Sequence, residues 1–280
     1  MSGVAGETII HPLAVVEQGA QLGAGVRIGP FCHVSADAVL GDRVELVSHV
    51  SILGATSLGE GCKVFPQAVL GAAPQNNKHK GGRTTLVVGR NCLIREGVTM
   101  HLGSDTSKAE TVVGDNGYFL AYTHIAHDCT VGNNVTMANL ATLGGHVVVG
   151  DFVNFGGLSA AHQNTRIGHH AFIGGMTAVF EDVIPYGMLR GPNGALRGLN
   201  LIGMKRSGMS RSEIHAVRNA FKAIFDRSRT MDENMAAAEK RFADSPAVLD
   251  VLAFMRSSGR RSYATPWRGR EDQSDDDGEV

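Results

Sequence analysis

Three observations in the sequence predict a mainly β protein, a parallel β-helix of hexapeptide repeats with a C-terminal α-helical domain. The first is an apolar residue at every sixth position, twelve times without a break: Val113, Phe119, Ile125, Val131, Met137, Leu143, Val149, Phe155, Ala161, Ile167, Ile173 and Val179. A period of six is a multiple of the two-residue period of extended chain, and it does not fit a helix. Each unit is too short to bury its own apolar side, so neighbouring units must stack.

The second observation is the small residue that lies four positions after each large one, as at Ala14 and Cys32. A large inward residue alternating with a small one fills a narrow tube with three walls. The same period starts at Ile10 and continues through Leu70, so we expect the β-helix to occupy residues 8–190. Glycine often follows the large residue, and we expect it to supply turns that other residues resist. If three units form one coil, residues 18 apart are stacked roughly 4.8 Å apart.

Two polar segments interrupt the repeats, at residues 72–86 and 102–112. Val88, Ile94 and Met100 keep the six-residue period between them. Because the period survives, we expect both segments to be loops that project from the tube, where binding groups are common.

The third observation is a change of pattern near Pro185. Residues 184–207 are expected to form an irregular connection, after which three helix-start signals follow: Ser210 with Glu213, Thr230 with Glu233, and Ser245 with Pro246. We therefore expect a helical domain at residues 191–257 that covers the open end of the tube and hides its strand edges. The acidic tail at residues 258–280 is expected to be disordered.

Composition excludes several classes of protein. Charged residues make up 19% of the chain and the net charge is −1, so neither nucleic-acid nor membrane-surface binding is indicated. No apolar run approaches the roughly 18 residues of a membrane span. The first seven residues lack the basic and apolar regions of a signal peptide. All four cysteines fall in the small inward positions of the repeat, so we expect buried thiols in a cytoplasmic protein.

Four histidines converge if the 18-residue coil is correct. They are His124 and His127 in AYTHIAHDCTVGNN, His146 in LGGHVVVGD, and His162, beside Gln163, in LSAAHQNTRIG. The units that hold them share one wall, so His127, His146 and His162 are expected on successive coils near one edge. His124 is expected at the corner that leads into this wall.

Such a cluster has three interpretations. Exposed structural histidines are the simplest. A zinc site could use His124, His127 and His146. Acid–base catalysis would use one imidazole near neutral pKa, with Asp128 or a nearby carbonyl orienting the ring. The residues themselves leave the second and third interpretations open.

The motif HIAHDCTVGN at residues 124–133, with Gly145–His146 and His162–Gln163 after it, resembles the UDP-N-acetylglucosamine acyltransferase family. The resemblance covers residues from about 8 to 256. It implies a left-handed β-helix and a homotrimer with active sites between neighbouring subunits. It also implies transfer of an (R)-3-hydroxyacyl chain from acyl carrier protein to the 3-hydroxyl of UDP-N-acetylglucosamine in lipid A synthesis, with no metal or other cofactor.

The resemblance also implies a role for individual residues. His127 matches the general base, and the backbone N–H of Gly145 matches the oxyanion donor. The matching substrate-binding positions are Gln75, Asn76, Lys78, His124, His146, His162, Gln163, Asn200 and Arg206. Gly175 matches the position that measures acyl length, where glycine predicts a long chain; Gly174–Gly175 as a simple turn is the alternative. An acidic carrier protein is expected to dock on a basic patch that includes Lys205, Arg206 and Arg211.

Three positions depart from the family pattern: Asn76 where relatives carry Asp, Ser207 where a second Arg is common, and Asn193 where a His is expected. Asn76 keeps a 3-amino UDP-sugar open as the acceptor. The related N-acyltransferase of the same pathway has an N-terminal uridine-binding domain, for which the repeats starting at Ile10 leave no room. A zinc-dependent hydratase of the γ-carbonic anhydrase kind remains a rival. A non-catalytic β-helix scaffold does not explain why four histidines converge.

Overall fold

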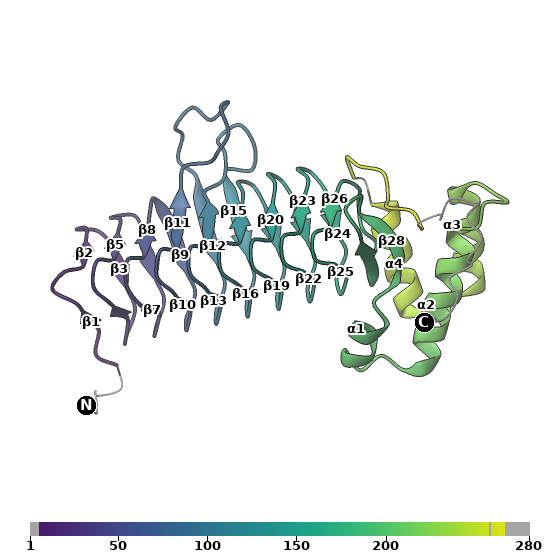
Figure 1. The fold of residues 1–280 in the computed structure, drawn as a ribbon, viewed down its shortest axis with the longest axis horizontal. Coiled ribbons are helices and arrows are strands. Elements are labelled where there is room, and N and C mark those ends of the chain that lie inside the picture. The colour runs from purple at the N-terminus through teal and green to yellow at the C-terminus, as the bar shows by residue number, and fades with distance from the viewer. Residues whose placement is uncertain (1–5, 258, 267–280) are drawn as a thin grey trace, which may run out of the picture.

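The computed structural model describes residues 6–257 and 259–266, and it shows a long parallel β-helix followed by a helical domain at one end (Figure 1). Three parallel sheets, here called sheets A, B and C, form the walls of the tube. Coils contribute one strand to each sheet, and before the last coil residues 18 apart pair wherever no loop intervenes, as Thr136 does with Asn154. The predicted three-walled β-helix is therefore confirmed.

The strands are short, and most contain two residues. Sheet A consists of β1 (Ile9–Ile10), β4 (Arg27–Ile28), β7 (Glu45–Leu46), β10 (Lys63–Val64), β13 (Leu93–Ile94), β16 (Tyr118–Phe119), β19 (Thr136–Met137), β22 (Asn154–Phe155), β25 (Phe172–Ile173), β27 (Gly187–Arg190) and β28 (Ala195–Leu199). Sheet B consists of β2 (Val15–Val16), β5 (His33–Val34), β8 (Ser51–Ile52), β11 (Val69–Ala72), β14 (Thr99–His101), β17 (His124–Ile125), β20 (Thr142–Leu143), β23 (Ala160–Ala161) and β26 (Ala178–Val179). Sheet C consists of β3 (Gln21–Leu22), β6 (Val39–Leu40), β9 (Ala55–Leu58), β12 (Thr85–Val88), β15 (Glu110–Val113), β18 (Thr130–Val131), β21 (Val148–Val149) and β24 (Arg166–Ile167).

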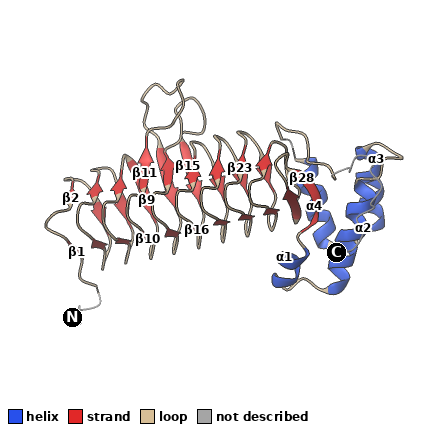
Figure 2. Cartoon of the chain, in the orientation of Figure 1, coloured by secondary structure: helices blue, strands red, loops and turns tan. Residues whose placement is uncertain are grey.

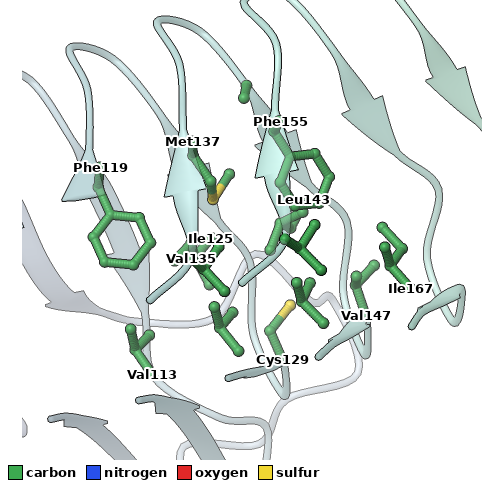
Figure 3. Close-up of a cluster of buried hydrophobic side chains, with 14 of the residues drawn as sticks. Val113, Phe119, Ile125, Cys129, Val135, Met137, Leu143, Val147, Phe155 and Ile167 are labelled. Atoms are coloured by element: carbon green, nitrogen blue, oxygen red, sulfur yellow. The ribbon is translucent and has the colours of Figure 1, made fainter. Parts of the chain in front are cut away.

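The second residue of each two-residue strand points into the tube. Phe119, Met137 and Phe155 lie one above another on sheet A and are almost completely buried (Figure 3). The predicted small inward positions are buried at the corners, as Val135 and Cys129 are. All four cysteines are buried and free, as predicted. Stacking of like residues on successive coils thus builds one continuous core along the axis.

Most of the glycines that follow the large residues do not have the left-handed φ of a turn, which corrects the prediction; Gly71, with φ 85°, is an exception. The left-handed φ at the corners is taken mainly by other residues, such as Asn134 with φ 56° and Phe152 with φ 59°, and at some corners by a glycine, such as Gly25 with φ 69°. Gly132 is needed for space instead, because a Cβ there would lie 2.8 Å from the backbone of Gly150 in the next coil. These glycines let successive coils approach each other at the corners.

The two interruptions are loops, as predicted, and they project together from one side of the tube (Figure 1). They connect β11 to β12 and β14 to β15, so the strands leave residues 73–84 and 102–109 outside the sheets. The loops bind each other: Asn76 Nδ2 donates to Ser104 Oγ at 3.0 Å, and the Gly82 N–H donates to Asp105 Oδ2 at 2.8 Å.

Residues 184–207 are more regular than expected. β27 continues sheet A, with Leu189 paired to Ile173, and turns back into β28 as an antiparallel hairpin. A short helix, α1 (Leu201–Arg206), follows. The hairpin therefore crosses the boundary that we expected between the β-helix, residues 8–190, and the helical domain, residues 191–257. The six-residue pattern missed β27 because its pairing partner lies 16 residues back rather than 18.

Three longer helices follow at the same end of the tube (Figure 2). They are α2 (Arg211–Ile224), α3 (Met231–Arg241) and α4 (Pro246–Arg256), and they begin after the predicted caps Ser210, Thr230 and Ser245. Only Thr230 forms a complete capping box. The Glu213 carboxylate instead accepts a hydrogen bond from Ser245 Oγ at 2.6 Å, which ties α2 to the start of α4. No helix in the described ranges is long and apolar enough to cross a membrane.

Residues 259–266, here called the C-terminal strap, are ordered, which corrects part of the predicted disordered tail. The strap runs back along the β-helix through bridges between Asp182 and Tyr263 and between Leu196 and Pro266. A buried ion pair beneath it, Arg166 with Asp182 at 2.6 Å, also binds the Tyr263 hydroxyl. These specific contacts outweigh the polar composition that suggested disorder. The rest of that prediction, residues 267–280, lies outside the described residues.

Candidate functional site

His127 and Asp128 form a dyad at the corner between sheets B and C. His127 Nδ1 lies 2.7 Å from Asp128 Oδ2, and the Asp128 side chain is completely buried. The other carboxylate oxygen accepts the Ser104 N–H at 3.1 Å, and Thr111 Oγ1 accepts the Asp128 N–H at 2.8 Å. A carboxylate on Nδ1 keeps the proton on that nitrogen, so Nε2 presents its lone pair. Of the two orienting groups considered from the sequence, the structure has Asp128.

His146 packs edge-to-face on His127, with ring centroids 5.2 Å apart. Its Nε2 lies 3.9 Å from Asp128 Oδ2. Burial lowers the pKa of His146, and the Asp128 charge partly opposes that shift. This corner can also hold a cation in principle, because one ligand atom each from His127, Asp128 and His146 lies within 4.8 Å of the others. His124, expected in a zinc site, is not in this group.

His124 lies on sheet B with a second histidine, His101, that the sequence analysis missed. The two rings are 5.1 Å apart, edge to face, and His124 Nδ1 lies 2.8 Å from Thr99 Oγ1. Burial, followed by the charges of His101 and His127, lowers the pKa of His124 to about 4. Burial also lowers the pKa of His101, whose Nδ1 has no hydrogen-bond partner in the described structure. Neutral imidazoles therefore line this wall at neutral pH.

Gly145 lies directly against the His127 ring. A Cβ at this position would be 2.7 Å from His127 Cε1 and 2.8 Å from Nε2. Among the described residues, no acceptor takes the Gly145 N–H. This N–H is therefore available beside the nitrogen that carries the free lone pair, where a developing oxyanion could accept it.

The remaining predicted residues of this corner come from the next coil and from the first loop. His162 and Gln163 are exposed, and both contact Arg261 of the C-terminal strap. Gln75 and Lys78 are exposed on the first loop. Two hydrogen bonds link the first loop to the dyad. The Asn76 amide donates to Ser104 Oγ, and the Ser104 N–H donates to Asp128 Oδ1.

Asn200 and Arg206 lie at a different corner, between sheets C and A. They border a pocket of about 860 Å³ under α1, together with Phe152 and His170. Asn200 caps α1 by accepting the Gly203 N–H at 2.9 Å, and it donates to the His170 carbonyl at 2.9 Å. Within one chain, the predicted binding residues are thus divided between two corners.

Gly175 lies at the third corner, between sheets A and B. Its φ is not left-handed, and a Cβ would meet only the Gly157 backbone, 3.3 Å from the carbonyl oxygen. Gly175 does lie in the turn between β25 and β26, but its φ is one that other residues also adopt. Beside it, exposed apolar residues of four successive coils form a column: Tyr122, Leu140, Leu158 and Met176.

Comparison with known proteins agrees with this geometry. A family model described as UDP N-acetylglucosamine O-acyltransferase, domain 2, matches residues 182–263. The chain is 61% identical over 273 residues to the acyl-[acyl-carrier-protein]--UDP-N-acetylglucosamine O-acyltransferase of Mesorhizobium japonicum, covering 98% of each chain. The enzyme of the same name from Bartonella henselae is 56% identical over 92% of this chain and 94% of its own. The chain belongs to the UDP-N-acetylglucosamine O-acyltransferase family.

Solved structures of this acyltransferase family share the fold. UDP-N-acetylglucosamine acyltransferase from Campylobacter jejuni superposes with a TM-score of 0.86 at 37% identity, over 92% of this chain and all of that one. The enzyme from Arabidopsis superposes with a TM-score of 0.82 at 34% identity, over 92% of this chain and all of that one. The left-handed β-helix and the C-terminal helices implied by the resemblance are confirmed.

Three residues of this candidate site were not found from the sequence: His101, Ser104 and Arg261. His101 follows its inward residue Met100 directly, at a repeat position that Ala126 occupies one coil later. Ser104 and Arg261 belong to a loop and a tail that carry no periodic signal. The sequence signal that could have indicated Arg261 is the basic pair Arg260–Arg261, just after the last predicted helix.

Proposed function

We propose that this acyltransferase moves an (R)-3-hydroxyacyl chain from acyl carrier protein to the 3-hydroxyl of UDP-N-acetylglucosamine, the first step of lipid A synthesis. The names of relatives up to 61% identical support the donor and the acceptor. The observation that carries the mechanism is the His127–Asp128 dyad, with Gly145 against the open edge of its imidazole.

In this mechanism His127 Nε2 removes the proton of the sugar hydroxyl, and the oxygen attacks the carbonyl carbon of the thioester. The carbonyl becomes an oxyanion that accepts the Gly145 N–H. When the C–O bond is complete the C–S bond breaks, and His127 returns its proton to the departing thiolate of the carrier's pantetheine arm, which leaves as the thiol. Asp128 stabilises the imidazolium in between. A base of this kind contributes about 10²–10⁴ in rate.

The wild type should transfer the acyl chain to UDP-N-acetylglucosamine, and His127→Ala should lose several hundred-fold or more in kcat. His33→Ala is a matched control, because His33 pairs with Glu17 on a distant coil near the N-terminus. An unchanged rate in His127→Ala, with His33→Ala also unchanged, would remove His127 as the base. No transfer by the wild type would overturn the proposed acceptor.

The division of the site between corners supports a homotrimer with shared sites. The groups around His127 and the pocket around Arg206 can serve one substrate if neighbouring copies bring the two corners together. The exposed column from Tyr122 to Met176 gives such copies an apolar surface to bury. Co-expression of His127→Ala with Arg206→Ala should restore part of the activity that each variant lacks. Mixed assemblies with no recovered activity would count against shared sites.

We further propose that the carrier protein docks in the cytoplasm on the exposed cations Lys205, Arg206 and Arg211. The KM for the acidic carrier should rise with salt in the wild type, and less so in a Lys205→Gln, Arg211→Gln variant. Equal salt dependence in both would exclude this patch.

A 3-amino UDP-sugar is the alternative acceptor, motivated by Asn76. An amide at this position donates to Ser104, whereas an Asp would accept. Assay of both sugar nucleotides with wild type and Asn76→Asp decides between them: preference for the hydroxyl sugar supports our proposal.

A zinc hydratase is tested separately. Chelation should leave acyl transfer unchanged, whereas zinc bound in stoichiometric amount would support that rival.

A further inference from the structure

The C-terminal strap delivers an arginine to the substrate-binding corner. It is fixed by Arg166, which binds Asp182 Oδ2, Ser257 Oγ and the Tyr263 hydroxyl at 2.6, 2.6 and 3.0 Å. Gly259 passes so close to this network that a Cβ would lie 2.4 Å from the Asp182 carboxylate. The position of Arg261 is thus set by a hydrogen-bonded framework built on the buried Asp182 carboxylate.

Arg261 makes two hydrogen bonds from one nitrogen. Its Nη2 lies 2.6 Å from His162 Nδ1 and 3.0 Å from the Gln163 carbonyl oxygen. His162 Nδ1 also lies 3.3 Å from that same carbonyl oxygen. Nδ1 therefore has two available partners, a guanidinium that can only donate and a carbonyl that can only accept.

The shorter contact decides the protonation of the ring. Because the guanidinium always donates, a 2.6 Å contact requires a lone pair on His162 Nδ1. The proton of the neutral imidazole is then on Nε2. Arg261 also donates to the Gln163 carbonyl oxygen, the group that could otherwise accept a hydrogen bond from an Nδ1–H. Nε2 has no hydrogen-bond partner among the described residues, so its N–H is free to donate.

We propose that Arg261 is a positioning residue that holds His162 in the Nε2–H tautomer, so that this histidine donates a hydrogen bond to an oxygen of the bound substrate. The inference rests on the proposed function, in which His162 binds substrate. Without Arg261, Nδ1 takes the proton and donates to the Gln163 carbonyl. Nε2 then presents a lone pair to the substrate oxygen, and an attraction becomes a repulsion.

The direct test is the tautomer. In long-range proton–nitrogen correlation spectra of the full-length enzyme with nitrogen-15 histidine, the wild type should show His162 with its proton on Nε2. The resonance is assigned by its absence in His162→Gln. Arg261→Met should move the proton to Nδ1, while Arg260→Met, which removes a neighbouring cation bound to Asn164, should not. The same tautomer in wild type and Arg261→Met would overturn the proposal.

Kinetics supply a second readout. Arg261→Met should lower kcat/KM roughly tenfold, the loss expected for one substrate hydrogen bond. Arg261→Lys should recover part of this loss, because an ammonium can still donate to Nδ1. In a His162→Gln background, where the amide donates from a comparable position without a tautomer, Arg261→Met should cost much less. Equal losses in both backgrounds would overturn the proposal, whereas a wild type that transfers nothing would instead overturn the proposed function.

Discussion

Asp128 holds His127 through a 2.7 Å contact although the two residues are adjacent in the chain. Adjacent side chains of an extended strand point to opposite sides. Here the corner of the coil intervenes, and Asp128 has a left-handed φ of 61°. The corner brings a completely buried carboxylate back to the ring that precedes it. The loop residue Ser104 then fixes the second carboxylate oxygen.

Asp128→Asn should lower kcat about 10²- to 10⁴-fold with little change in KM. The amide can turn its NH₂ toward His127 Nδ1, which places the proton on Nε2 and removes the base. Steady-state rates measure this. Asp42→Asn is the matched control, because Asp42 likewise accepts a backbone N–H, that of Ala24, but lies far from the site. Equal effects of both substitutions would mean that Asp128 serves folding alone.

Gly145→Ala should lower kcat at least a hundredfold because the new methyl group must displace the His127 ring, which lies 2.7 Å away. The backbone at Gly145 has no left-handed φ, so the fold should tolerate alanine. The thermal midpoint should change little and UDP-sugar binding should persist. A rate close to that of wild type would show that the ring and the glycine move apart during catalysis.

Gly175→Met should shift the preferred acyl donor toward shorter chains. The Cβ would lie 3.3 Å from the Gly157 carbonyl oxygen, a tight contact, and the rest of the side chain would extend over the surface that carries the exposed residues Leu158 and Met176. Competition between 3-hydroxyacyl carrier proteins of different lengths measures the preference, and Gly175→Ala should give a smaller shift. An unchanged profile in Gly175→Met would assign chain length to another position.

Acid should destabilise the protein through His124. Its folded-state pKa of about 4 lies below the ordinary value of 6.5, because burial and the neighbouring charges of His101 and His127 disfavour the cation. Between these values the unfolded chain binds a proton that the folded chain does not, so stability falls as pH drops from about 6.5 to 4. The loss is at most about 3 kcal/mol, and partial exposure reduces it. His124→Gln should have a thermal midpoint less sensitive to pH over this range; an identical slope would contradict the assignment.

The sequence predicted the parts of the molecule that repeat. Inward residues such as Phe119 and Met137 follow from a six-residue period, since stacking on successive coils imposes the same environment on each. The corner with His127 and His146 was predictable for the same reason. The glycine role was wrong because the period shows where Gly132 lies but not which atoms approach it. Arg261 escaped prediction because no periodicity relates a tail to the coil that it touches.

Arg261 and His162 are in contact although they lie 99 positions apart in the sequence, so the two residues are made at different times during synthesis. A coil of the β-helix contacts mainly its neighbours, so the tube can assemble in order while the chain is still being made. At a synthesis rate of roughly 5–20 residues per second, Arg261 is made on the order of 5 to 20 seconds after His162. During that interval the nascent chain lacks the contact that Arg261 makes with His162. A nascent chain therefore completes the corner around His162 only after Arg261 has been made.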